Sequence, residues 1–535
     1  MTARRVIPIA LLGSAAVWPE WARFRMTTPS LEDDWFGVTY SGQALHALLH
    51  GHYGASGLDF AGRYRPSYTA IWNYAQWNLF GRHSMATVAA WGVVRAALFL
   101  LAVWILAAWL LDRRSPFGRP LVWLAPFAIA LTPGIAVSLA RYGPGDPMMI
   151  TGLVLGLALL GSGVRTLLVD RPTGRVRARA VGVIIVGYLV YLIGVYAKES
   201  SLCVLVFVPF FVAWLRPVLR TYALQSRAVR SLLTALAVVV LAPLVHVAVH
   251  LGLAFAAGER PYPVAHTFGE KLLAGIVSPL LGAPGLMQTW LWTLAVPFSF
   301  AVVIETARRR DRDAWLLTGI LVTGFLMSAL SLARGEVATW YYIPWIVGVA
   351  VVAFRGLART NLAQIAVGLL VVVVALSVTR TELASSARME RSGSAAIEMA
   401  KGAVAAGCPV YLANFDIEQR VAIPLLFGFA RAKRIHSCTR GSSEAYAVSW
   451  KRAHSAPVPL GLASRCRSAW RKVTVDGGAS MYACSSFRAG GIPDQIEASG
   501  TPRVTVVRLR PTKRAPRPEH IFQSPSSLRG EPTGV

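Results

Sequence analysis

Acidic side chains are scarce in this chain. Only 26 of its 535 residues are Asp or Glu, against 54 Lys or Arg, and charged residues make up 15% of the sequence. Soluble domains usually carry about 25% charged residues. The hydrophobic share is 55% and the mean hydropathy is +0.50, so a single water-soluble globule is excluded and most of the chain must lie in lipid.

The excess of basic residues has two explanations. A formal net charge of +28 would suggest a nucleic-acid partner if it lay on a soluble domain. Much of this charge lies in short Arg-rich linkers between apolar segments, where it orients membrane helices. We therefore expect the lipid bilayer as a partner, and no nucleic acid.

About eleven apolar segments are long enough, or nearly so, to cross a hydrocarbon core of roughly 30 Å. They lie at 6–19, 86–111, 121–140, 147–168, 180–196, 201–215, 232–254, 288–306, 315–333, 341–354 and 362–379. The first segment is short and contains Pro8, which leaves a signal peptide as an alternative. No Ala-x-Ala-like site follows it cleanly, so an uncleaved first helix is preferred. The sequence predicts an α-helical polytopic membrane protein.

The linkers between these segments alternate in charge. Because Lys and Arg near helix ends mark the cytoplasmic side, the basic linkers and the N-terminus are predicted inside. The C-terminal region is then outside, at a plasma or inner membrane. The basic linkers are 112–119, 170–179, 216–230, 307–313 and 354–360.

From about residue 380 the apolar periodicity changes. We predict a transmembrane module over 1–380, a small extracytoplasmic α+β domain over 381–510 and a disordered tail over 511–535. Within the domain, 407–415 is typical of a strand and 415–430 of an amphipathic helix. A hairpin is predicted over 471–487, turning at Asp476–Gly477.

Four of the five cysteines lie in this C-terminal region: Cys408, Cys438, Cys466 and Cys484. In an oxidising compartment they are candidates for one or two disulfides, with three pairings open for two bridges. Zinc is the alternative, although no Cys-x-x-Cys pair supports it.

The linkers predicted to face outward hold most of the polar residues suited to chemistry. Glu32, Asp33 and Asp34 follow the first apolar segment. Ordinary explanations stay open, because acids are often solvated or cap helices and a lysine can neutralise a helix C-terminus. Charges between closely spaced spans are nonetheless more often functional than surface pairs. The further candidates are Arg63, Arg65, Arg141, Asp146, Lys198, Glu199 and Arg334.

Polar residues also occur within the apolar segments. His246 and His250 lie four residues apart on one face of segment 232–254, where they could hold a metal, contact a headgroup or be satisfied interfacial side chains. Arg95, within segment 86–111, is expected to extend its charge to the membrane interface.

Together, these features resemble the membrane-embedded glycosyltransferases of the GT-C fold, such as protein O-mannosyltransferases, aminoarabinose transferases and arabinosyltransferases. The resemblance covers the layout of about 1–380 and assigns no subfamily. Many relatives carry a His near the second span, where this chain has His83 and then Arg95, so those contacts do not transfer. The motifs are EDDW at 32–35, GRYRP at 62–66, Asp146 and AKES at 197–200.

The resemblance implies an inverting transfer of sugar from a polyprenyl-phosphate donor to a glycan, lipid or protein acceptor at the outer membrane face. Asp33 or Asp34 would take the proton of the acceptor hydroxyl. Cations would bind the donor phosphate: Lys198, Arg334, Arg63 and Arg65. Supporting polar roles fall to Glu199, Asp146 and Arg141. No metal or other cofactor is assigned, although Asp146 leaves room for a divalent cation, Mg²⁺ or Mn²⁺.

Two other functions are alternatives. A transporter or flippase usually has inverted repeats and mid-membrane ionisable groups, whereas this chain has no visible repeat and gathers its acids in outer linkers. A lipid-linked glycan polymerase or ligase shares the donor lipid but depends on large external loops rich in Arg and His.

Overall fold

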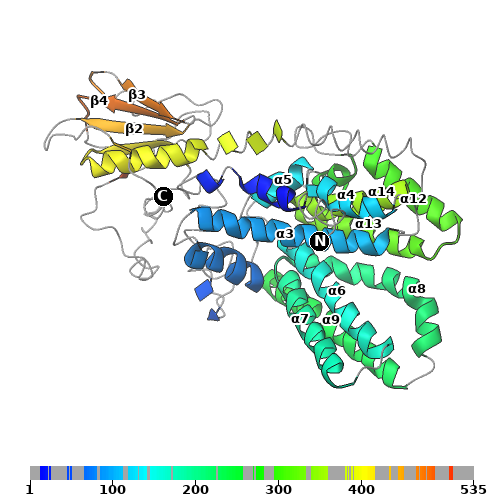
Figure 1. The fold of residues 1–535 in the computed structure, drawn as a ribbon. Helices are drawn as coiled ribbons and strands as arrows, with labels where there is room; N and C mark the ends of the chain where they lie inside the picture. The colour runs from blue at the N-terminus through cyan, green and yellow to red at the C-terminus, as the bar shows by residue number, and fades with distance from the viewer. Residues whose placement is uncertain are drawn as a thin grey trace, which may run out of the picture. The chain divides into compact units, whose positions relative to one another are not determined.

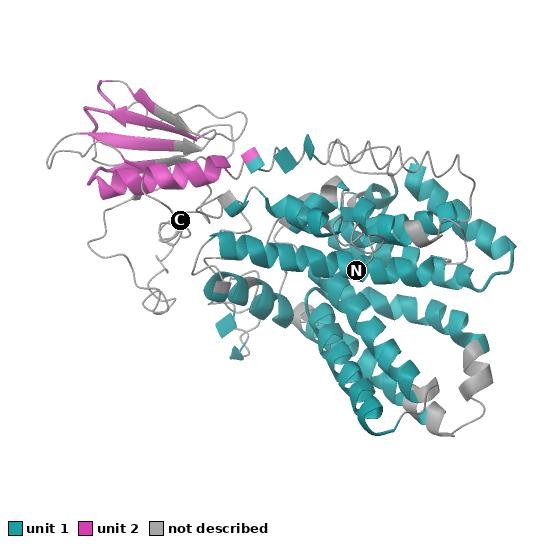
Figure 2. Ribbon diagram, in the orientation of Figure 1, with its two compact units in different colours: residues 1–26, 44–387 teal, residues 27–43, 388–535 magenta. Residues whose placement is uncertain are grey.

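The computed structural model of the protein divides into two compact units, which Figure 2 shows in different colours. Unit 1 comprises residues 1–26 and 44–387, and unit 2 comprises residues 27–43 and 388–535. The structure describes residues 12–21, 23–25, 45–46, 49–50, 65–80, 85–111, 118–130, 132–140, 145–169, 173–223, 227–256, 269, 273–281, 294–332, 339–358, 380–381, 383–384, 387–388, 391–415, 433–434, 444–450, 466–468, 470–476, 479–488 and 505–509.

Unit 1 is built from helices in its described part (Figure 1). Its α-helices are α3 (Met85–Leu110), α4 (Gly118–Ala130), α5 (Pro133–Ala140), α6 (Asp146–Val169), α7 (Gly174–Val195), α8 (Val204–Ala223), α9 (Arg227–Ala256), α11 (Ser278–Leu281), α12 (Val296–Arg308), α13 (Asp313–Leu332) and α14 (Ile343–Ala358). Segments of 3₁₀ or π helix precede or separate them: η1 (Trp18–Glu20), η2 (Arg23–Arg25), η3 (Tyr68–Phe80), η4 (Glu199–Cys203), η5 (Leu273–Val277) and η7 (Thr339–Tyr342).

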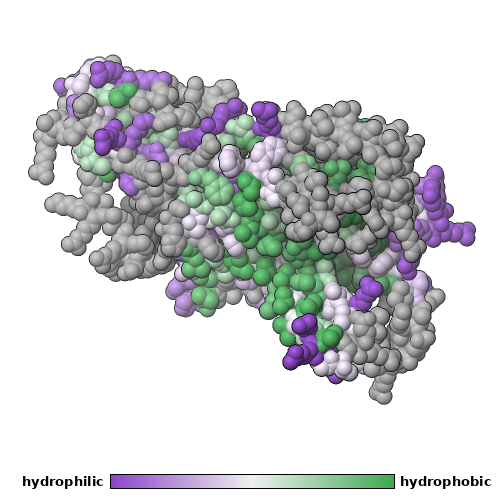
Figure 3. Space-filling model, viewed as in Figure 1, coloured by the Kyte–Doolittle hydropathy of each residue, from purple (hydrophilic) through white to green (hydrophobic). Residues whose placement is uncertain are grey.

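Within the described residues, six helices are long and apolar enough to cross a membrane: Met85–Leu110, Asp146–Leu167, Gly174–Val195, Glu199–Pro217, Thr234–Leu253 and Asp313–Leu332. Each matches one predicted apolar segment. Their exposed side chains are largely apolar, and Figure 3 shows hydrophobic surface over the middle of this unit with hydrophilic patches near helix ends. The prediction of a polytopic α-helical membrane protein is therefore confirmed.

Three of the remaining predicted segments form shorter or interrupted helices in their described parts. Segment 341–354 becomes the 16-residue α14, and the described part of 288–306 ends in the 13-residue α12. Segment 121–140 is divided between α4 and α5, and α5 begins at Pro133, a residue type that is favoured in the first turn of a helix. Segment 362–379 lies outside the described residues.

Helices α6 and α7 pack against each other through glycines. A Cβ atom at Gly156 would lie 2.5 Å from the backbone nitrogen of Tyr191, and one at Gly152 would overlap the backbone of Gly194. In lipid, such small residues let two helices approach closely and gain dispersion energy along their length. Because α6 begins at Asp146 and α7 ends at Val195, this antiparallel pair brings the polar residues around 146 and 198 to the same end.

Unit 2 contains a five-stranded mixed sheet with the strand order β3-β4-β2-β1-β5. The strands are β1 (Val410–Phe415), β2 (Ala445–Trp450), β3 (Arg471–Asp476), β4 (Ala479–Cys484) and β5 (Thr505–Leu509). Strands β1 and β2 are parallel, and the other neighbours are antiparallel. The sheet and a helix over 391–405 confirm the small C-terminal α+β region.

The sheet of unit 2 separates two apolar clusters because neighbouring side chains along a strand point to opposite faces. Val410 packs with Ala396, Ile397 and Met399 of the helix over 391–405. The next residue, Tyr411, belongs to the cluster on the opposite face, where it packs with Phe487, Cys466 and Cys484.

Several sequence-based expectations for unit 2 can be compared directly. The strand in 407–415 is β1, and the hairpin at Asp476–Gly477 is the β3–β4 pair, whose last partners are Asp476 and Ala479. The helix over 391–405 was not predicted. The expected amphipathic helix over 415–430 and the tail over 511–535 lie outside the described residues, apart from Phe415.

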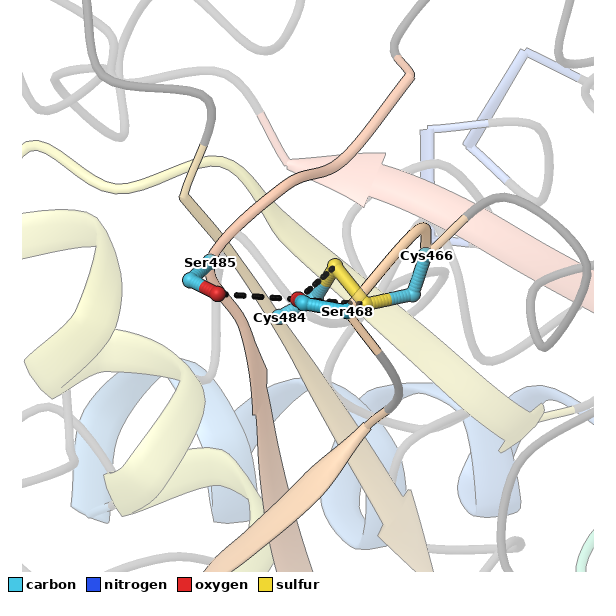
Figure 4. The surroundings of a disulfide bond; sticks show 4 residues. All are labelled: Cys466, Ser468, Cys484 and Ser485. Carbon is cyan, nitrogen blue, oxygen red and sulfur yellow. Dashed lines mark hydrogen bonds between the residues drawn. A yellow bond between two sulfur atoms is a disulfide. The ribbon is translucent and has the colours of Figure 1, made fainter.

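Cys466 and Cys484 form a disulfide with 5.8 Å between their Cα atoms. Figure 4 shows Ser468 beside it, with the Ser468 hydroxyl 3.5 Å from the Cys466 sulfur and bonded to Ser485 at 2.8 Å. Cys408 is also disulfide-bonded, while Cys438 lies outside the described residues. The free cysteine of the described part is Cys203, which is buried in unit 1.

Candidate functional site

Four charged residues from three separate linkers meet in unit 1. We call Arg65, Asp146, Lys198 and Glu199 the four-charge cluster. All four are buried, and each was a candidate from sequence. Arg65 precedes η3, Asp146 begins α6, Lys198 lies between α7 and η4, and Glu199 begins η4.

Lys198 and Asp146 form the first ion pair of this cluster. The Lys198 ammonium donates to both carboxylate oxygens of Asp146, at 2.7 and 2.6 Å. The side chains are 3% and 1% exposed. The ammonium also lies 4.4 Å from the ring centroid of Tyr341, a distance at which the ring face attracts a cation.

Local backbone structure explains why this pair forms. Asp146 occupies the first turn of α6, where a carboxylate is favoured by the unpaired N–H groups and the helix dipole. The preceding Gly145 permits a close approach, because a Cβ atom there would lie 3.2 Å from the Ala197 carbonyl oxygen and 3.4 Å from the Tyr68 ring. Residues 145–146 and 197–198 can therefore lie side by side.

Arg65 and Glu199 form the second ion pair. The Arg65 Nε donates to Oε2 of Glu199 at 2.8 Å, and Nη2 lies 2.5 Å from the same oxygen. Two guanidinium nitrogens thus share one carboxylate oxygen, a geometry that a lysine ammonium cannot reproduce. Because Glu199 follows Lys198 directly, the two pairs share one short segment of backbone.

Burial dominates the electrostatics at Lys198. It lowers the pKa of the Lys198 ammonium to about 8, while Asp146 and Glu199 raise this pKa and Arg65 lowers it. The cluster holds two cations and two carboxylates, so its formal charge is zero. Burying four charges costs more than burying apolar groups of the same size, and a cluster of this kind is a candidate for function rather than stability.

The structure brings together only part of the predicted site. Arg65, Asp146, Lys198 and Glu199 meet, and Tyr341 joins them from the last outward linker. The other candidates lie outside the described residues: Asp33, Asp34, Arg63, Arg141 and Arg334. Among the described residues, no group of three or more His, Cys, Asp or Glu side chains is placed to hold a metal ion.

A second buried polar group surrounds Arg95. Its guanidinium donates to the Gln76 amide oxygen at 3.4 Å and to the Leu139 carbonyl at 3.3 Å. It lies 3.8 Å from a Glu20 oxygen and 4.1 Å from the Trp72 ring centroid. The expectation that Arg95 extends to the membrane interface is therefore wrong, because it is 6% exposed and its charge is satisfied inside the helical unit.

Neither Glu20 nor Gln76 was predicted to have a role. The available signal was the single acid at the end of the first apolar segment, together with the single arginine inside the second. Opposite charges in apolar segments tend to pair, because each is costly in lipid without the other. Gly92 gives Glu20 room, since a Cβ atom there would overlap its carboxylate.

The comparison with solved structures gives a structural likeness. No protein-family model matches the sequence, and no curated protein matches it. A crystal structure of ArnT from Cupriavidus metallidurans in the apo state matches with 14% identity and a TM-score of 0.45, covering 89% of this chain and 97% of that one. ArnT is an aminoarabinose transferase.

Proposed function

We propose that the protein is a membrane glycosyltransferase that moves a sugar from a polyprenyl-phosphate donor to an acceptor hydroxyl at the extracytoplasmic membrane face, with inversion. The four-charge cluster carries this proposal. It joins side chains from three linkers predicted to lie on one side of the membrane. The ring of Tyr341, from a fourth such linker, lies against the Lys198 ammonium.

The cluster suits a phosphate group in its chemistry. Arg65 offers a planar fork of donors and Lys198 offers a compact charge, which are the two ways proteins bind phosphate. Asp146 and Glu199 now balance those charges. A lipid phosphate would either replace Asp146 as the acceptor of the Lys198 protons or add to the cluster with the charge of Arg63 and Arg334.

The reaction needs a base as well as a phosphate site. The acceptor oxygen forms a bond to the anomeric carbon as the bond from that carbon to the phosphate oxygen breaks, and the electron pair leaves with the lipid phosphate. Asp33 or Asp34 takes the hydroxyl proton, and the cations stabilise the charge on the leaving phosphate. Attack from the face opposite the phosphate inverts the anomeric carbon.

The leading experiment replaces Asp33→Asn and Asp34→Asn singly in the full-length purified protein, supplied with a polyprenyl-phosphate sugar. The variant that lacks the base should lose most of its turnover and keep its affinity for the donor. Glu32→Gln is the matched control, because it removes the neighbouring carboxylate and should leave turnover intact. Full activity in both Asn variants would exclude this assignment of the base.

The membrane face needs its own test. Trp35→Cys places a thiol beside Asp34, and a Cys203→Ala background removes the free thiol of unit 1. In intact cells, a membrane-impermeant maleimide should label this thiol. Labelling only after the membrane is opened would place the acidic residues on the cytoplasmic side and contradict the proposal.

One observation favours a second candidate, a transporter or flippase. Arg95 and Glu20 form a buried pair within the helical unit, and intramembrane pairs of this kind often mark transport pathways. Reconstituted vesicles separate the two functions. Sugar transfer that survives Arg95→Gln would support the enzyme, whereas lipid translocation lost in Arg95→Gln, with no transfer by the wild type, would support the transporter.

A further inference from the structure

Two histidines and a tyrosine form a polar chain apart from the four-charge cluster. The Tyr196 hydroxyl lies 3.0 Å from Nδ1 of His246, and Nε2 of His246 lies 3.1 Å from Nε2 of His250. Both histidines belong to α9, and Tyr196 directly follows α7. Two ring nitrogens from neighbouring turns of one helix therefore converge on a single point.

The spacing of these nitrogens suits two ligands of one metal ion. With Zn–N bonds of about 2.0–2.1 Å, two nitrogens at neighbouring tetrahedral positions lie roughly 3.3 Å apart. The two imidazole rings are steeply inclined, at 84° with 4.6 Å between their centroids. At 3.1 Å the two nitrogens share a proton, and a cation between them would take the place of that proton.

Tyr196 supplies the support that a metal-binding histidine needs. A ligating histidine usually donates its other ring N–H to a neighbouring oxygen, which fixes the tautomer and the ring orientation. The Tyr196 oxygen is placed to accept that bond from Nδ1 of His246. In this tautomer, Nε2 of His246 carries a lone pair that faces His250.

A second histidine pair shows that spacing alone does not create this arrangement. His46 and His50 are also four residues apart, but their rings stack at 21° with 4.0 Å between centroids. Nδ1 of His50 lies 2.8 Å from the His46 carbonyl oxygen. The chain thus contains its own control, a pair with the same sequence spacing and a different geometry.

We propose that His246 and His250 bind a divalent transition-metal ion through their Nε2 atoms, with Tyr196 as a positioning residue. Imidazole nitrogen suits Zn²⁺, Cu²⁺ and Ni²⁺, whereas Mg²⁺ and Mn²⁺ prefer oxygen ligands. The site is therefore different from a carboxylate-held cation at Asp146. His246 is exposed on α9 beside the exposed Val245 and Val249, so the remaining coordination positions of the ion would face outward from this helix.

A bound ion would also act on the backbone that leads to Lys198. Tyr196 is two residues before Lys198 and would be held against α9 through His246. The bound metal would then limit the movement of residues 196–199, a segment that includes both Lys198 and Glu199. This site does not depend on the proposed glycosyltransferase activity, because metal binding is measured without any sugar donor.

The test uses the full-length protein in detergent, purified without a polyhistidine tag and titrated with Cu²⁺ alone. Electron paramagnetic resonance should show one ion per chain coordinated by nitrogen, and this signal should disappear in His246→Ala and in His250→Ala. Tyr196→Phe should weaken binding by about 10–100-fold, the usual effect of losing such a supporting bond. The control variant His46→Ala with His50→Ala should bind as the wild type does.

Equal binding by the wild type and by the His246→Ala with His250→Ala variant would overturn the proposal. A second measurement avoids substitution altogether. In the wild type, Zn²⁺ should protect His246 and His250 from modification by diethyl pyrocarbonate, read by mass spectrometry, while His46 and His50 stay reactive. Absence of that protection would also overturn the proposal.

Discussion

Two of the ionic clusters in the described part of unit 1 each pair an Asp at the start of a helix with a basic side chain, and they differ in their surroundings. The four-charge cluster lies where α6 begins and α7 ends. The Asp313 cluster lies where α13 begins and near the end of α14: Arg355 bonds to Asp313 and to the Leu110 carbonyl, and Trp214 donates to Asp313 at 2.8 Å. Helix α14 extends from beside Tyr341, which covers Lys198, to Arg355, so the two clusters occupy opposite ends of it.

The two clusters differ in how deeply their side chains are buried and in which helices they connect. The Asp313 side chain is 26% exposed and has one ion-pair partner, whereas Asp146 and Lys198 are almost fully buried. Arg355 connects the ends of three helices with one guanidinium, a structural clamp. The four-charge cluster buries one lysine, one arginine and two carboxylates, where apolar side chains would often be at least as stable, so it is a candidate for ligand binding.

The largest expected effect comes from Lys198→Met. This change leaves the Asp146 carboxylate buried without its partner, which should cost about 3–5 kcal/mol of unfolding free energy. It also removes a cation proposed to stabilise the leaving phosphate, so turnover should fall by about 100-fold or more. Thermal unfolding in detergent and a sugar-transfer assay measure the two losses.

The matched double variant Lys198→Met with Asp146→Leu separates the two losses. Replacing both charges with apolar side chains should restore most of the stability, while activity stays absent. If activity recovered together with stability, the four-charge cluster would have only a structural role, as the Asp313 cluster does.

The next effect is that of Arg355→Met, at the other end of α14. Asp313 keeps its bond to Trp214 and part of its solvent exposure, so the loss should be about 1.5–3 kcal/mol, the usual range for a hydrogen bond to a charged group. Turnover per folded molecule should be unchanged. A large loss of turnover without loss of stability would erase the distinction between the two clusters.

A smaller effect is expected for Arg65→Lys. Lysine keeps the charge but loses the fork that holds Glu199. We expect a loss of about 1–2 kcal/mol, or about 5–30-fold, in donor affinity, measured by titration with the lipid phosphate. Unchanged affinity would remove Arg65 from the phosphate site.

The smallest effect concerns pH. Because burial lowers the pKa of Lys198 to about 8, its positive charge is present below this pH and is lost as the pH rises through it. Affinity for the phosphate donor should therefore decline above pH 8 in the wild type. The Lys198→Arg variant keeps its positive charge at high pH, so its affinity for the donor should not decline above pH 8. An identical decline in both proteins would assign the titration to another group.

Much of the fold could be predicted from sequence. The six long spans and the β3–β4 hairpin follow from runs and alternation of apolar residues, which depend on neighbours close in the chain. The prediction that the basic linkers lie on one side of the membrane agrees with the Asp313 cluster. In that cluster, residues beside or within the basic linkers 112–119, 307–313 and 354–360 meet. The orientation of the C-terminal region outside the cell stays a prediction.

Partners within the site could not be predicted in the same way. Lys198 and Arg65 were predicted to bind phosphate, but nothing in the sequence indicated that Asp146 and Glu199 would be their partners. Arg95 was expected at the membrane surface, because neither Glu20 nor Gln76 lies near it in the chain. The convergence of His246 and His250 depends on ring orientation, which their spacing does not specify.

The sequence by itself determined that this protein crosses a membrane, and it located the six described helices that are long and apolar enough to do so, because the transfer of apolar side chains from water to lipid depends on composition. Only the tertiary structure decided which charges meet. A buried charge must find an opposite charge or a hydrogen bond close by, and whether one is within reach depends on how helices far apart in the chain pack together.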